Sequence, residues 1–163
     1  MMPERETRAL VSEEVLTKSL ESARSWCRNN LGRCVRGVVC KYDYDIFRFI
    51  IDNEQISDMS LDPKEEGLIR VSQKNLDFLK RRREAFCEMM GIDRSCEDDV
   101  IMGAAEVDIE SIFVHEIAEF IVNIDTSIYL QNCVPLTRFP HDVACIVENA
   151  NRKERGLKPW FHS

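Results

Sequence analysis

Residues 107–124 (VDIESIFVHEIAEFIVNI) constrain the fold more than any other stretch, because they predict a helix that is apolar around most of its circumference. At about 100° per residue, one apolar face follows Ile109, Phe113 and Ile117, and further apolar side chains flank it. Only a narrow strip is polar. This strip consists of Asp108, His115, Glu116, Glu119 and Asn123. We therefore expect the rest of the chain to be organised around this helix.

The polar strip contains the motif His-Glu-x-x-Glu, which is suited to binding a metal ion. The i, i+4 spacing stacks His115 on Glu119 one turn apart, and such a pair can chelate one ion. Zinc accepts imidazole and carboxylate ligands, and a catalytic zinc site has three protein ligands and one open position. His141 is the natural third ligand, because the connecting segment is long enough to fold the last helix back antiparallel.

Three further side chains have expected roles near this site. Glu116, adjacent to His115, could take a proton from metal-bound water, whose pKa the metal lowers to about 7. Glu148 shares a helix face with His141, so it is either a fourth ligand or the carboxylate that orients an imidazole. Cys145 could be a soft ligand, but we favour its interpretation as a half-buried structural thiol.

Apolar spacing and end signals predict the other elements. The expected helices are residues 12–30, with Ser12 as N-cap, residues 75–90, with Gly91 as the stop, and a last helix from Pro140 to Gly156. The expected strands are residues 35–42, 46–52 and 68–72, with a loop over residues 58–67 and a partly helical connector around residues 127–132. The fold class is thus a mostly helical, single α+β domain, with about five helices around a small mixed or antiparallel sheet.

The chain of 163 residues, 44% of them hydrophobic, is long enough to bury a core as one domain over residues 1–163. Residues 1–11 are an expected frayed end, and residues 157–163 are either docked or frayed. The net charge of −7 argues against a nucleic-acid partner. The basic run at residues 80–83 is interpreted as a solvated helix face.

Cysteine usage and hydropathy bear on the location of the protein. The seven cysteines form no Cys-x-x-Cys pair, and their odd number argues against a closed disulfide framework. No segment approaches the roughly 18 apolar residues of a membrane span. We therefore expect a cytoplasmic protein with reduced thiols and no membrane partner.

The order of helix, strands and the segment VHEIAEF resembles a minimal zincin metallopeptidase, a family with His-Glu-x-x-His on one helix. The resemblance implies that His115 is the first metal ligand, Glu116 the general base, Glu119 the ligand one turn on and His141 the downstream ligand. It also implies a peptide or protein substrate, bound along the edge of a strand beside the helix, for which residues 68–72 are the candidate. The second histidine of the family motif is Glu119 here. Two histidines and one carboxylate are kept if His141 supplies the other imidazole.

Other interpretations of the same residues stay open. Two histidines and one carboxylate also form the site of non-haem Fe(II) oxygenases, so iron is a second metal candidate behind zinc. A ferritin-like di-iron site would need Glu-x-x-His pairs, which His115 and His141 lack. The polar strips could instead face solvent in a metal-free helical adaptor. The apolar flanks of the His115 helix also leave room for a homodimer interface.

Overall fold

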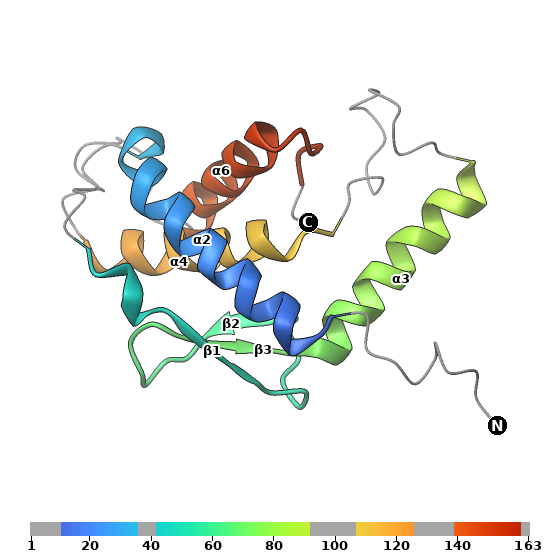
Figure 1. Ribbon diagram of the computed structural model, residues 1–163, viewed down its shortest axis with the longest axis horizontal. Coiled ribbons are helices and arrows are strands. Elements are labelled where there is room, and N and C mark those ends of the chain that lie inside the picture. The colour runs from blue at the N-terminus through green and yellow to red at the C-terminus, as the bar shows by residue number, and fades with distance from the viewer. Residues whose placement is uncertain (1–10, 36–41, 92–106, 126–138, 161–163) are drawn as a thin grey trace.

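The computed structural model describes residues 11–35, 42–91, 107–125 and 139–160. Within these ranges the chain forms four α-helices, one short 3-10 helix and a three-stranded sheet (Figure 1). The elements are α2 (Glu13–Cys34), η1 (Tyr44–Ile46), β1 (Arg48–Ile51), β2 (Met59–Leu61), β3 (Leu68–Val71), α3 (Gln73–Met90), α4 (Ile109–Ile124) and α6 (Phe139–Glu154). The expected mostly helical α+β class is confirmed. The expected connector helix around residues 127–132 lies outside the described residues.

Several predicted helix ends are confirmed by their capping contacts. The Ser12 hydroxyl accepts the Val15 N–H at 3.2 Å, and Gly91 ends α3 with a φ of 64°, in the left-handed region that glycine adopts without strain. The predicted end of the first helix near residue 30 is wrong, because α2 continues to Cys34. Leu31 is fully buried, so its packing in the core carries the helix through the expected stop.

The sheet is mixed, with strand order β1-β3-β2. β1 runs parallel to β3, and β2 runs antiparallel to it. The expected loop over residues 58–67 is therefore partly wrong, since it contains the three-residue strand β2, which is too short to show an alternating pattern. The expected strand over residues 68–72 is confirmed as β3, but β3 is the central strand. Of the remaining expected strand over 35–42, residues 36–41 lie outside the described residues.

Helix α4 is the centre of the fold, with α2 and α6 packed on different sides of it (Figure 1). Aromatic side chains connect the sheet region to α4. The centroids of the Phe47 and Phe120 rings are 5.3 Å apart, and those of Phe49 and Phe113 are 6.1 Å apart. The flanks that were expected to be available for a dimer are buried inside the domain. Val114, Ala118, Ile121 and Val122 are all 1% exposed or less.

Helix α6 presents a partly polar face to the core, which differs from its expected apolar side. Ile146, expected on that side, is 64% exposed, whereas Glu148 and Arg152 are 2% and 1% exposed. Arg152 is tolerated there because its guanidinium is hydrogen-bonded: Nε donates to the Lys158 carbonyl at 2.7 Å and Nη1 to the Ser111 hydroxyl at 3.2 Å. Tertiary pairing therefore decides which face of α6 is buried.

The segment after α6 is docked against the helices. Asn149 donates to the Trp160 carbonyl at 3.1 Å and accepts the Trp160 N–H at 2.7 Å. Arg83 of α3 lies over the Trp160 ring at 4.4 Å, so the basic run at residues 80–83 is not wholly a solvated face. For residues 157–160 the frayed alternative is wrong. Residues 1–10 and 161–163 lie outside the described residues.

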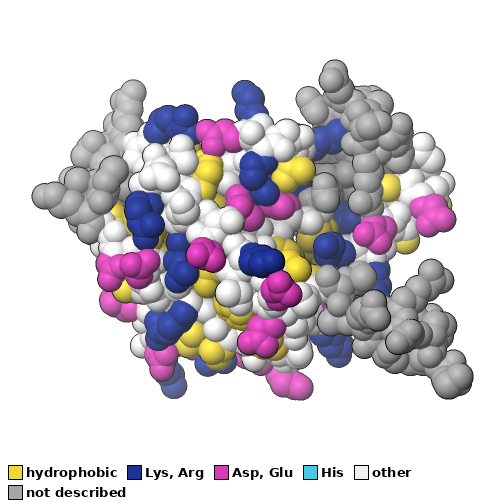
Figure 2. Space-filling view, viewed as in Figure 1, with side chains coloured by type: hydrophobic (Ala, Val, Ile, Leu, Met, Phe, Trp, Pro, Cys, Tyr) yellow, Lys and Arg dark blue, Asp and Glu magenta, His cyan; other side chains and the backbone are white. Residues whose placement is uncertain are grey.

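The α-helices in the part of the chain that the structure describes are 16 to 22 residues long. None of these helices combines the length and apolar character needed to cross a membrane. On the face shown in Figure 2, basic and acidic side chains are interspersed. Among the described residues, that face shows no broad basic area.

Asp108 joins the start of α4 to α6 and should make stability depend on pH in acid. Its carboxylate caps α4 through the Ser111 N–H at 2.9 Å and pairs with Arg155. Burial raises the pKa of Asp108, but the hydrogen bonds from Arg155 and Ser111 outweigh burial and lower it. Because the folded pKa lies below the unfolded value of about 3.9, this stabilisation is present above that value and disappears as the pH falls through the folded pKa.

Asp108→Asn should therefore lower the free energy of unfolding by about 1 to 2 kcal/mol at pH 7, and the difference from wild type should vanish in strong acid. Urea unfolding at both pH values measures this. Asp43→Asn, at an exposed cap that accepts the Asp45 N–H, is the matched control and should show little change at either pH. If Asp108→Asn lowered the free energy of unfolding equally at both pH values, the ionised carboxylate would not be the source of the stabilisation.

Candidate metal centre

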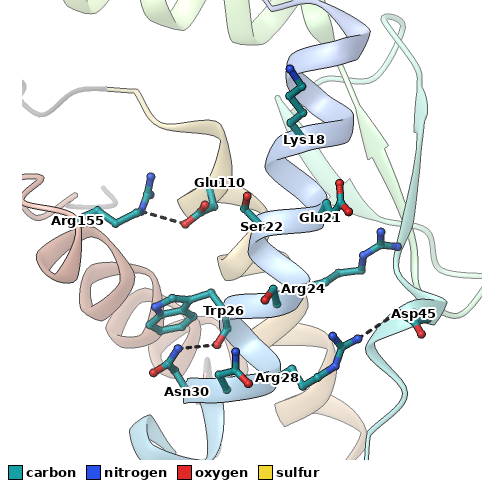
Figure 3. Close-up of a pocket in the computed structure, with 12 residues that line it drawn as sticks. Lys18, Glu21, Ser22, Arg24, Trp26, Arg28, Asn30, Asp45, Glu110 and Arg155 are labelled. Atoms are coloured by element: carbon teal, nitrogen blue, oxygen red, sulfur yellow. Dashed lines mark hydrogen bonds and ion pairs between the residues drawn. The ribbon is translucent and has the colours of Figure 1, made fainter.

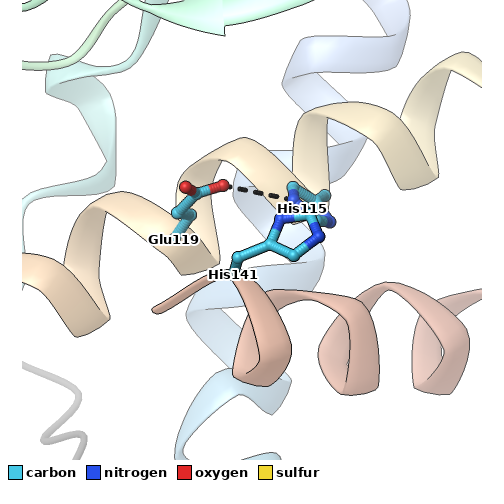
Figure 4. Close-up of side chains that lie close together, drawn as sticks. All are labelled: His115, Glu119 and His141. Carbon is cyan, nitrogen blue, oxygen red and sulfur yellow. Dashed lines mark ion pairs between the residues drawn. The ribbon is translucent and has the colours of Figure 1, made fainter. Parts of the chain in front are cut away.

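Helices α4 and α6 bring together the three residues that were predicted to bind a metal. His115 and Glu119 lie one turn apart on α4, and His141 lies in the first turn of α6 (Figure 4). One possible ligand atom from each residue lies within 4.8 Å of the others. The antiparallel return of α6 along α4 creates this meeting, as the length of the connecting segment had suggested.

The distances within this cluster match those between ligands of one ion. His115 Nε2 lies 3.2 Å from Glu119 Oε2, and the two imidazole rings are 5.0 Å apart between centroids. Two N or O ligands at about 2.0 to 2.1 Å from a tetrahedral zinc ion are about 3.3 Å apart. His115 and Glu119 therefore already have the separation that shared coordination requires.

The cluster is closed at one end and accessible at the other. His115 is only 5% exposed, which contradicts the interpretation of its strip as a solvent face. The Glu119 side chain is 32% exposed, and His141 is half-buried. A cation, or a water molecule next to it, could therefore reach the three residues from the Glu119 side.

Glu148 lies on the opposite edge of the His115 ring from Glu119. Its Oε1 is 3.1 Å from His115 Nδ1, whereas Glu119 faces Nε2. The two nitrogens of one imidazole point in different directions, so an ion bound at Nε2 is on the far side of the ring from Glu148. Of the two expected roles for Glu148, this geometry favours the carboxylate that orients His115.

The cluster is strongly charged without an ion. Burial lowers the pKa of His115, but hydrogen bonds with Cys145, Glu119 and Glu148 outweigh burial and raise it to about 12. The metal-free form thus holds an imidazolium between two carboxylates. A metal ion would take the place of that proton, since only neutral imidazole is a ligand.

Glu116 lies next to His115 on α4 but faces a different set of groups. Burial raises the pKa of Glu116 to about 8; the charge of His115 lowers it, and those of Glu119, Asp58 and Glu148 raise it. Asp58 immediately precedes β2, so Glu116 is near that end of the sheet. Asp58 was not among the predicted site residues, because β2 and its contact with α4 were not predicted.

Glu148→Gln should weaken metal binding by about 10-fold to 100-fold while one ion still binds, because an amide orients His115 less well than a carboxylate. Titration with zinc against a competing chelator measures the affinity. Asp142→Asn removes an exposed charge from the same helix and should leave the affinity almost unchanged. Complete loss of the ion in Glu148→Gln would instead identify Glu148 as a direct ligand.

A separate hollow lies along α2 and shares no residue with the cluster (Figure 3). Its cationic side chains are already engaged. Arg28 pairs with Asp45 at 3.1 Å, and Arg155 pairs with Glu110 at 3.0 Å. Arg24 donates to the Phe47 carbonyl at 2.9 Å. These contacts explain the hollow as a framework of surface ion pairs, so the chemistry of the described residues concentrates at the His115 cluster.

Comparisons of the chain with protein-family models, with curated proteins and with solved structures find no match. The likeness to zincins therefore stays a prediction that rests on the residues of α4 and on His141. The case for a function has to come from the geometry of the site itself.

Proposed function

We propose that the protein is a metal-dependent hydrolase, and more specifically a zinc peptidase, with its ion held by His115, Glu119 and His141. The observation that carries this proposal is the meeting of three ligand groups from α4 and α6 within 4.8 Å. The cluster is buried at His115 and accessible at Glu119, so a fourth coordination position could open to solvent on that side. Catalytic zinc sites have three protein ligands and one such position.

Zinc is our first choice of metal, and iron is the second. Two imidazoles and one carboxylate suit zinc, but the same set serves non-haem Fe(II). The described scaffold is mostly helical, whereas the β-rich barrels that usually hold such iron sites are not seen in it. Zinc also binds nitrogen ligands more tightly than Fe²⁺ does.

Glu116 is our candidate for the general base. A divalent ion held by the three ligands would supply a Lewis acid, which lowers the pKa of water to about 7. Glu116 follows the first ligand directly on α4 and is not one of the three clustered ligands, but the charges of His115, Glu119 and Glu148 act on its carboxyl group. In this proposal the ionised form of Glu116 accepts the proton of the attacking water, while Glu148 holds His115 in place.

A peptide substrate needs a strand edge near the helix, and β2 replaces the earlier candidate. β3 cannot serve, because β1 and β2 pair with its two sides. Within the described residues β2 is an edge strand, and it contacts α4. An extended peptide that adds to β2 would run beside the helix that holds the catalytic residues. We keep the cytoplasm as the proposed location on the strength of the cysteine pattern.

Metal analysis of the untagged protein tests the proposal, and we expect about one equivalent of zinc per chain. The reference sample contains free zinc at about one hundred times its Kd. Relative to that sample, removal of the ion with a chelator should lower the melting temperature by about 5 to 10 °C. Added zinc should restore it. One equivalent of iron would direct the search to redox chemistry, and no metal after reconstitution would favour the adaptor.

A further inference from the structure

The Cys145 thiol lies beside the His115 cluster, where the less favoured interpretation of the sequence placed a soft ligand. It lies one turn after His141 on α6, and its Sγ is 3.6 Å from His141 Nε2. The thiol also interacts with the His115 side chain. Cys145 is half-buried and is not part of a disulfide. Its sulfur atom therefore contacts both imidazoles that face the proposed ion.

We infer that the Cys145 thiolate is a fourth ligand of the metal centre and occupies the position that a hydrolase must open for water. This inference rests on the proposed metal centre and adds its regulation. In a tetrahedral site, sulfur at about 2.3 Å and nitrogen at about 2.0 to 2.1 Å from zinc are about 3.5 Å apart. The observed separation between Cys145 and His141 is 3.6 Å.

Cys145 differs from the structural thiol that its sequence position suggested. Cys27 shows what such a thiol looks like here: it is fully buried in the apolar core, and burial raises its pKa. Cys145 instead contacts two imidazoles in a site that solvent can reach. A thiol in such surroundings is available as a ligand.

The charges of the proposed ligands balance those of the ion. The Glu119 carboxylate and a Cys145 thiolate carry two negative charges, which neutralise a divalent cation in this partly buried site. When the ion binds, metal–sulfur and metal–nitrogen bonds form to Cys145 and His115, the thiol proton and the imidazolium proton pass to solvent, and nothing is oxidised. Four protein ligands close a zinc site, as in structural centres. The resting protein is therefore latent, and hydrolysis requires that the thiolate leave.

Cobalt(II) in place of zinc tests the inference by spectroscopy. We expect wild type to show tetrahedral visible bands together with a near-ultraviolet thiolate-to-cobalt charge-transfer band. Cys145→Ser should lose the charge-transfer band and keep the visible bands. Cys34→Ser, a half-buried cysteine on α2, is the matched control and should keep both.

A second measurement uses the unaltered protein, so that it holds even if Cys145→Ser does not fold. Zinc should protect Cys145 from iodoacetamide and leave the alkylation of Cys34 unchanged, as read by peptide mass spectrometry. Three results would show that Cys145 is not a ligand while leaving the proposed metal centre intact. The first is bound cobalt without the charge-transfer band, and the second is a charge-transfer band that is still present in Cys145→Ser. The third is alkylation of Cys145 at the same rate with and without zinc. Failure to take up cobalt or zinc would overturn both the fourth ligand and the metal centre.

Discussion

His115→Ala is expected to abolish metal binding and to lower the free energy of unfolding by about 3 to 5 kcal/mol. His115 is the ligand with the least exposure, and its ring contacts Glu119 through one nitrogen and Glu148 through the other. Without it, the Glu148 carboxylate, which is 2% exposed, loses the adjacent positive charge in a region that excludes water. Elemental analysis and urea unfolding of the metal-free protein measure the two effects separately.

His141→Ala is the matched comparison, because it removes the other imidazole from a half-buried position. It should also abolish metal binding, but the metal-free protein should lose clearly less stability than with His115→Ala. Retention of a full equivalent of metal in both variants would rule out the proposed centre. Equal losses of stability in the two variants would show that the burial of His115 does not determine its contribution to the free energy of unfolding.

Glu116→Gln is expected to reduce the turnover of a peptide substrate by about 10²-fold to 10⁴-fold while the ion stays bound. The amide has nearly the same size as the carboxylate, but it cannot accept a proton from water. Because the three proposed ligands are unchanged, metal content should equal that of wild type. Zinc-dependent cleavage of a peptide library, followed by mass spectrometry, supplies the substrate and the rate.

Glu88→Gln controls for the loss of one negative charge, since Glu88 is exposed near the end of α3. It should cleave at the wild-type rate. Full turnover in Glu116→Gln would remove Glu116 from the chemistry, and loss of the ion would make it a ligand. If wild type is latent because of Cys145, the comparison should be repeated in the Cys145→Ser background, where the difference between Glu116 and Gln should be larger.

Local spacing was enough to predict α4 and the pairing of His115 with Glu119. Residues one turn apart on a helix share a face whatever surrounds them. His141 could be added because a long connection allows α6 to return along α4. These features depend on neighbours in sequence or on chain length, so they can be predicted without a structure.

The features that the sequence did not predict depend on tertiary packing. β2 has three residues and acquires its identity only by pairing with β3. The inward face of α6 is set by the partners of Glu148 and Arg152, which come from α4 and from the segment after α6. Which nitrogen of His115 faces which carboxylate depends on the side-chain rotamer. No periodicity in the sequence encodes these choices.

The central position of α4 has a consequence for biosynthesis. During synthesis His115 and Glu119 leave the ribosome before His141, so until α6 is made the proposed site has only two of its three ligands. Glu148, whose carboxylate contacts His115, also arrives only with α6. A nascent chain could therefore hold a cation only weakly, and tight loading would have to follow translation. If the proposed centre binds zinc in a cell, the metal content of this protein would report how much of it has completed its fold.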